Sequence, residues 1–173
     1  FLSFSTITAQ WRKQNIDTKA SFRGLSVVNQ NVIWAWGTAG TFLRTIDGGF
    51  TWKNQQSPVN AVISSVFTRD KLSAVAVGAR GTIISTIDGG KKWLAINSEV
   101  KDHLYSVTFT GENLLTGFAV GTYGRIIKTK DGGKTWNSID SKTNQHLSKV
   151  SFFDENKGVT VGADGLIIAT KNG

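Results

Sequence analysis

The sequence predicts an all-β fold in which one unit of about 40 residues is repeated. The segment from Gly37 to Trp52 recurs from Gly78 to Trp93, from Gly121 to Trp136 and, in part, from Gly162 to Gly173. The leading glycines are 41, 43 and 41 residues apart. That period is typical of a four-stranded propeller blade, and no unit has the 3.6-residue apolar spacing of a helical repeat. We therefore expect a β-propeller of four-stranded antiparallel blades, with about four blades present.

Short β-branched and aromatic runs separated by glycines predict the strands of each unit. In the third unit, strands A to D are expected at residues 104–109, 117–120, 125–129 and 136–139. Strand A is expected to carry a core valine in each unit, and strand C a pair of core apolar residues. The valines are Val27, Val66, Val107 and Val150, and the pairs are Phe42-Leu43, Ile83-Ile84, Ile126-Ile127 and Ile167-Ile168.

A glycine-bounded hairpin is predicted between strands B and C. Its central pairs are Thr38-Ala39, Ala79-Arg80, Thr122-Tyr123 and Ala163-Asp164. In a propeller these hairpins share one rim with the D–A links, whereas the A–B turns and C–D turns share the other rim. Rim loops are where such scaffolds carry function, so Arg80, Tyr123 and Asp164 are candidate binding residues.

The connection between strands C and D carries the sharpest motif. Its members in the three complete copies are Asp47, Gly49 and Trp52, then Asp88, Gly90 and Trp93, then Asp131, Gly133 and Trp136. In such a turn a short carboxylate accepts hydrogen bonds from backbone N–H groups two or three residues on, and glycine supplies positive φ values. The tryptophan then buries a large ring between strands. One carboxylate per turn falls short of the six or more oxygen ligands of Ca²⁺, so the aspartates are expected to be structural.

These turns resemble the Asp-box, also called the bacterial neuraminidase repeat. The longer string Gly-x-x-Gly-x-Ile-x-x-Thr-x-Asp-Gly-Gly-Lys-Thr-Trp resembles the photosystem II stability/assembly factor family of seven-bladed propellers and its relatives in non-photosynthetic bacteria. The resemblance covers Trp11 to Gly173. It implies a non-catalytic role in helping another complex form. Lys92 replaces the hydroxyl residue of the motif and Asn172 replaces its aspartate, a position where asparagine also serves.

Both ends of the sequence suggest a longer array. The last copy stops at Gly173, before its tryptophan, while Trp11 lies 41 residues before Trp52 and predicts another strand D. The blades in residues 11–173 are therefore expected to close as a ring, with the first strand joining the last blade, or to form part of a seven-bladed propeller. Residues 1–10 resemble the end of a secretory signal peptide, cleaved after Ala9, or form an edge strand. A signal peptide would make the protein an exported one, periplasmic or extracellular.

The start of strand A should lie nearest the central channel of the propeller. Arg23, Val62, His103 and His146 each precede their aligned valine by four residues. The two histidines of the chain thus occupy equivalent positions, and with Arg23 they could line an anion or metal pocket. Two histidines without a third ligand are weak support for a metal. We therefore predict no metal or cofactor and treat Arg23, His103 and His146 as candidate binding residues.

The chain is basic, with 20 Lys and Arg residues against 12 Asp and Glu residues and a net charge of +8. A basic surface suits nucleic acid, an anionic membrane or an acidic protein. The aromatic residues fall at repeat-core positions rather than among the lysines, so no nucleic-acid partner is predicted. Scattered lysines fit a solvated surface, and contact with a membrane surface stays open. The absence of cysteine excludes disulfides and thiolate chemistry, and nothing predicts the oligomeric state.

A sialidase-like glycoside hydrolase is the alternative function, because those enzymes also carry Asp-boxes. Such an enzyme needs three arginines for the substrate carboxylate, a tyrosine nucleophile with a glutamate partner, and an acid/base aspartate. The nearest match to its Phe/Tyr-Arg-Ile-Pro signature is Phe22-Arg23-Gly24-Leu25, which lacks Ile-Pro, and only Tyr105 and Tyr123 are available as nucleophiles. We therefore predict a non-enzymatic propeller that docks a protein or peptide partner on the rim opposite the Asp-boxes.

Overall fold

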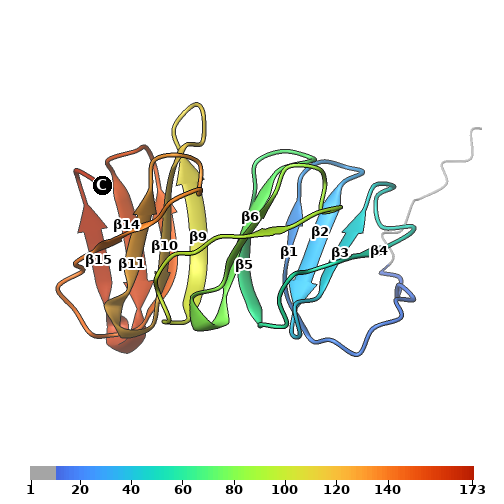
Figure 1. Cartoon of the computed structure of the whole chain (residues 1–173), viewed down its shortest axis with the longest axis horizontal. Helices are drawn as coiled ribbons and strands as arrows, with labels where there is room; N and C mark the ends of the chain where they lie inside the picture. Colours follow the sequence, from blue (N-terminus) through green and yellow to red (C-terminus); the bar gives the residue numbers. More distant parts are fainter. Residues whose placement is uncertain (1–10) are drawn as a thin grey trace, which may run out of the picture.

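The computed structural model describes residues 11–173, which form four antiparallel sheets that follow one another in chain order (Figure 1). The first two sheets consist of β1 (Phe22–Val27), β2 (Ile33–Gly37), β3 (Phe42–Thr45) and β4 (Lys53–Gln55), then β5 (Ile63–Thr68), β6 (Ala74–Gly78), β7 (Ile83–Thr86) and β8 (Leu94–Ala95). The last two consist of β9 (Leu104–Thr110), β10 (Thr116–Gly121), β11 (Ile126–Thr129) and β12 (Asn137–Ile139), then β13 (Leu147–Phe152), β14 (Gly158–Gly162) and β15 (Ile167–Thr170). Each sheet is one repeat unit, and this confirms the predicted propeller blades.

The strand limits follow the sequence pattern closely. In the third blade each predicted strand differs from β9, β10, β11 or β12 by one residue at an end, which is within the usual uncertainty of strand limits. The B–C hairpins of blades 2 to 4 contain short 3₁₀ turns, η1 (Ala79–Gly81), η2 (Thr122–Gly124) and η3 (Ala163–Gly165). Among the described residues, no helix has the length and apolar character needed to cross a bilayer.

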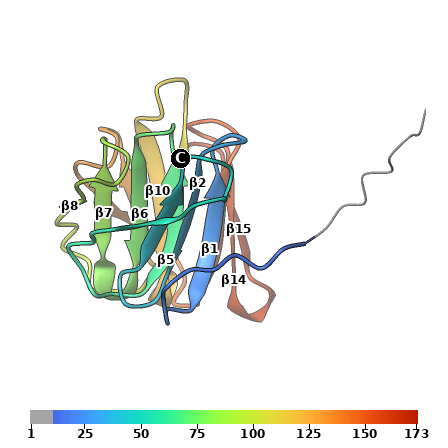
Figure 2. The ribbon, with the colours of Figure 1, turned by 90° about the vertical axis from the view of Figure 1, so that its right-hand side faces the viewer.

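The blades stand beside one another through their first strands. Strand β1 contacts β5, β5 contacts β9, and β9 contacts β13. The first and fourth blades lie at opposite ends of the row in Figure 1. Figure 2 shows the second blade with β5 beside β1 and with β8 at the outer edge. The first strands therefore form the inner surface of the arc.

Each pair of neighbouring blades encloses its own apolar core. The core between blades 1 and 2 contains fully buried Trp34 and Phe42, with Trp93 packed edge-on against Trp34 at 5.8 Å between ring centroids. The core between blades 2 and 3 is built around Phe109 and Trp136, and that between blades 3 and 4 around Phe118. Since a blade has no core of its own, each blade is stabilised by its neighbours.

Three sequence expectations fail at the two ends of the arc. Residues 11–21 form no strand and Trp11 is fully exposed, so the strand D expected there is absent from the described structure. Val27 and Ile167 are 61% and 69% exposed although both were expected in the core. The physical reason is shared, because a strand residue is buried only by an adjacent blade, and these residues face the outer sides of blades 1 and 4. The predictions for residues 1–10 lie outside the described residues.

The Asp-box turns hold a repeated hydrogen-bond network. The Thr45 hydroxyl donates to Asp47 Oδ1 at 2.6 Å, and Asp47 in turn accepts the N–H and the hydroxyl of Thr51 at 2.9 and 2.6 Å. Asp131 repeats these bonds with Thr129 and Thr135. The backbone donors lie three and four residues after the aspartate, one further than predicted. Glycines at positive φ, such as Gly49 at 98°, close the turn.

Backbone hydrogen bonds tie each Asp-box turn to the A–B turn of its own blade. The amide of the first Asp-box glycine, or of the residue that stands in its place, donates to a carbonyl of the A–B turn at 2.8–2.9 Å in all four blades: Gly48 to Asn31, Gly89 to Leu72, Gly132 to Leu115 and Gly173 to Asn156. Side chains then link neighbouring blades on the same rim. Arg69 of blade 2 donates to the Gly132 carbonyl of blade 3 at 2.7 Å and lies 4.3 Å from the Phe109 ring centroid.

Candidate functional site: the channel mouth

Every blade has a β-bulge at the same place in its first strand. The pairing register skips one residue between Phe22 and Gly24, and it skips one residue at the matching points of β5, β9 and β13. The residues left without a partner are Arg23, Ser64, Tyr105 and Ser148. Bulges of this kind redirect side chains and are frequent beside functional sites.

These four residues surround one hollow at the rim opposite the Asp-boxes. The hollow has a volume of about 600 Å³ and is lined by Arg23, Val62, Ser64, His103, Tyr105, His146, Ser148 and Ala163. We call it the channel mouth. The structure thus brings together Arg23, His103 and His146, the three candidate binding residues from the start of strand A.

The register of the first blade differs from the one that the sequence suggested. Leu25 pairs with Ala35 as Val66 pairs with Ala76, so Leu25, not Val27, is the equivalent of the core valines. Arg23 is accordingly equivalent to Ser64, and the equivalent of Val62 is Ser21. Arg23 still reaches the channel mouth because a shift of two residues keeps a side chain on the same face of a strand.

A leading glycine in each repeat allows the close approach that shapes the mouth. A Cβ atom at Gly78 would collide with the Val62 carbonyl, and one at Gly121 with the His103 carbonyl. Those carbonyls accept the backbone N–H groups of Ala79 and Thr122 at 2.9 Å. The glycine therefore fixes the start of strand A against the B–C hairpin, which explains why it recurs.

His103 is held in place from two sides. Its Nε2 lies 2.9 Å from the Ser64 hydroxyl oxygen, and its ring stacks on Tyr105 with centroids 4.6 Å apart. Burial lowers the pKa of His103 below its usual value. The neutral ring is therefore favoured at pH 7, and Arg23 is the one permanently charged side chain among the residues that line the mouth.

His146 is held by a different contact. Its Nδ1 accepts the backbone N–H of Tyr123 at 3.1 Å, and the Tyr123 ring packs against it edge-on at 5.4 Å. In this arrangement a neutral His146 carries its proton on Nε2. Tyr123 is the tip of the B–C hairpin of blade 3, so this hairpin reaches across to the first strand of blade 4.

The remaining rim candidates lie outside the mouth. Arg80 and Asp164 occupy hairpin tips equivalent to Tyr123, and all three are exposed with a left-handed backbone (φ 58°, 52° and 55°). Asp164 accepts a hydrogen bond from the Gln145 side chain at 3.2 Å. The described residues contain no cluster of three or more His, Asp or Glu side chains that could hold a metal ion.

The sequence reading missed three residues of the mouth, Ser64, Tyr105 and Ser148. Each lies two positions after Val62, His103 or His146. The two-residue alternation of a strand places such pairs on one face, and this was the available signal. It was hidden because the three residue types differ.

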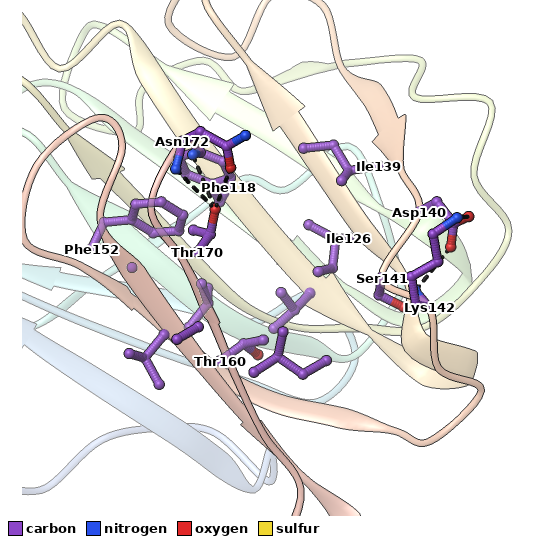
Figure 3. A pocket seen from close by; sticks show the side chains of 17 residues that line it. Phe118, Ile126, Ile139, Asp140, Ser141, Lys142, Phe152, Thr160, Thr170 and Asn172 are labelled. Carbon is purple, nitrogen blue, oxygen red and sulfur yellow. Dashed lines mark hydrogen bonds and ion pairs between the residues drawn. The ribbon is translucent and has the colours of Figure 1, made fainter.

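A second hollow, of about 420 Å³, lies between blades 3 and 4 (Figure 3). Phe118, Ile126 and Phe152 are among its lining residues. In the repeat, Phe118 and Ile126 match Trp34 and Phe42, the two residues against which Trp93 packs between blades 1 and 2. This hollow therefore belongs to the packing pattern of the blades, and we do not consider it a ligand site.

The residues of a glycosidase do not come together in the described structure. The channel mouth contains one arginine and no glutamate. Tyr105 lies in the mouth, whereas Glu112 and Glu155 lie in or beside A–B turns at the opposite rim. A tyrosine nucleophile with either of these glutamates as partner is thus not formed.

Comparison with known proteins identifies the family. The sequence model of the family described as photosynthesis system II assembly factor YCF48 matches residues 58–145 and, in a second match, residues 92–173. The chain belongs to this YCF48 family. No curated protein sequence matches the chain.

Solved structures show the same fold. YCF48 from Cyanidioschyzon merolae superposes with a TM-score of 0.72 at 21% identity, over 87% of this chain and 50% of that chain. An ancestral GH74 enzyme gives 0.75 at 15% identity, over 94% of this chain and 24% of its own length. The computationally designed Ika4 protein gives 0.76 at 13% identity, over 95% and 100% of the two chains. At these identities the likeness concerns the fold, and the chain spans half the length of the algal YCF48.

Proposed function

We propose that this protein is a non-catalytic assembly factor that docks a protein or peptide partner on the rim opposite the Asp-boxes. Membership of the YCF48 family supports the assembly role, because the family is described as an assembly factor of photosystem II. The observation that carries the proposal of a docking site is the repeated bulge, which turns one residue of every blade into the same channel mouth.

The chemistry of the mouth suits a peptide more than a small substrate. Arg23 supplies a charge for a carboxylate or a carbonyl, and Ser64 and Ser148 supply hydroxyl groups. Tyr123 is 68% exposed beside the mouth. Tyrosine and arginine are the residue types most often found at binding hot spots, and hairpin tips are the usual place for recognition on a rigid scaffold. No described group in the mouth is arranged as a nucleophile with a base.

A peptide library displayed on phage provides a direct test. Peptides selected on the wild-type chain are measured by calorimetry against three variants. Arg23→Gln and Tyr123→Ser should each weaken binding by tenfold or more, a typical hot-spot loss of about 2 kcal/mol. Phe50→Ser, on the Asp-box rim, should leave the affinity unchanged. Equal affinity of all four proteins would place the partner elsewhere and contradict the proposal.

A further inference from the structure

The two rims of the protein differ in exposed apolar side chains. The Asp-box rim is made of the A–B turns (28–32, 69–73, 111–115 and 153–157) and the C–D turns (46–52, 87–93, 130–136 and 171–173). Large apolar side chains on it are exposed by 44–88%: Ile46, Phe50, Leu72, Ile87, Leu115 and Phe153. The described hairpins and links of the opposite rim expose one such residue, Tyr123. The apolar side chains of the Asp-box rim come from all four blades.

The rims also differ in unpaired positive charge. Seven lysines lie on the turns of the Asp-box rim, all exposed and none in an ion pair: Lys71, Lys91, Lys92, Lys130, Lys134, Lys157 and Lys171. The two ion pairs found among the described residues, Arg125–Asp102 and Lys142–Asp140, both lie on the opposite rim. The unpaired lysines of the turns are thus concentrated on the rim that carries the exposed apolar residues.

Most of the acidic groups on the Asp-box rim are held close to the backbone. Five aspartates accept hydrogen bonds from N–H groups of their own turns: Asp47, Asp70, Asp88, Asp131 and Asp154. Lysine side chains extend from the same turns on flexible stems. A flat partner that approaches this rim therefore meets ammonium groups and apolar side chains before it meets the carboxylates.

We propose that the Asp-box rim rests on the surface of an anionic lipid bilayer. Phenylalanine and isoleucine at the turn tips would enter the boundary between headgroups and acyl chains, and the lysines would contact anionic headgroups. A planar partner fits better than a peptide, because the apolar residues stand singly on the turns of four successive blades. The channel mouth on the opposite rim would then face away from the membrane and stay open to a partner.

Co-sedimentation with extruded vesicles tests this surface. The chain should bind vesicles containing about one-third phosphatidylglycerol, bind pure phosphatidylcholine weakly, and dissociate as NaCl rises from about 0.05 M to about 0.5 M. The variant Lys91→Gln/Lys92→Gln/Lys134→Gln should lose about fivefold in partitioning per lysine. The variant Phe50→Ser/Phe153→Ser should also bind less at low salt. The replaced side chains are exposed, so circular dichroism should show an unchanged fold.

Matched controls come from the opposite rim. Arg80→Gln/Lys101→Gln removes two exposed charges without touching an ion pair, and Tyr123→Ser removes the exposed aromatic side chain of that rim. Both controls should bind vesicles as the wild type does. An equal loss in the controls, or a failure to bind anionic vesicles, would overturn the proposal. Binding to polyglutamate but not to vesicles, with loss in the lysine variant, would assign the rim to an acidic protein and overturn it as well.

Discussion

The backbone N–H of Tyr123 donates to Nδ1 of His146 across the junction between blades 3 and 4, at a distance of 3.1 Å. The bond fixes a hairpin tip of one blade to the first strand of the next. It also couples a residue exposed on the rim to one that lines the channel mouth.

Loss of the His146 ring should loosen this hairpin. A neutral hydrogen bond contributes about 1 kcal/mol, so His146→Ala should speed exchange of the Tyr123 amide hydrogen about fivefold. Hydrogen-exchange NMR provides the measurement. His103→Ala is the control, because His103 makes its side-chain hydrogen bond with Ser64 and should leave the Tyr123 amide unaffected. Equal acceleration in both variants would mean a general loosening of the rim.

The Asp-box carboxylates should titrate at unusually low pH. Hydrogen bonds from the Thr45 hydroxyl, then from the hydroxyl and N–H of Thr51, lower the pKa of Asp47 to about 2. Partial burial acts to raise the pKa of Asp131, but hydrogen bonds from Thr135, Thr129 and Lys134 outweigh it and also lower this pKa to about 2. Carbon-detected NMR titration of the two carboxyl groups checks these values.

The pH dependence of stability follows from the sign of these shifts. A carboxyl group whose pKa is lower in the folded state stabilises that state above the unfolded pKa, near 3.8, and loses the effect as pH falls toward 2. Urea unfolding should therefore show falling stability between about pH 4 and pH 2. Asp131→Asn should flatten this dependence and reduce stability at pH 7. An unchanged slope would show that Asp131 does not contribute.

Blade 2 supplies a natural comparison for the same turn. Lys92 stands where Thr51 and Thr135 stand in the other copies, so Asp88 lacks the second hydroxyl donor. A backbone hydrogen bond from Lys92 is the main reason that the pKa of Asp88 is lowered. Lys92→Thr should lower the pKa of Asp88 further, and the same NMR titration would show it.

The two tryptophans at the same repeat position, Trp11 and Trp93, should differ sharply in their effect on stability. Trp93 is 5% exposed and packs 4.4 Å from Phe42 between ring centroids, so Trp93→Ala should reduce the free energy of unfolding by about 3–5 kcal/mol. Trp11 is fully exposed, and Trp11→Ala should change it by less than about 0.5 kcal/mol. Urea unfolding measures both, and Trp93→Phe provides a milder variant if Trp93→Ala does not fold. A large loss with Trp11→Ala would mean that this residue packs in solution.

The repeat made the blades, the hairpins and the Asp-box turns predictable, because each depends on local residue types. Register in blade 1 was not predictable from a single valine, since Leu25 and Val27 are both apolar and lie two residues apart on one face. Exposure of Val27 and Ile167 depends on which blade stands beside them, and a blade's own sequence does not contain that information. The bulges escaped prediction because Arg23, Ser64, Tyr105 and Ser148 share a position but no chemistry.

The bond between each A–B turn and its Asp-box turn has one more consequence. It joins two backbone groups, and its acceptor residue is asparagine in blades 1 and 4 and leucine in blades 2 and 3. The side chains of these turns are therefore free to change without weakening the closure of the blade. A descendant of this chain could acquire a new surface on that rim by substitutions alone, with the scaffold beneath unaltered.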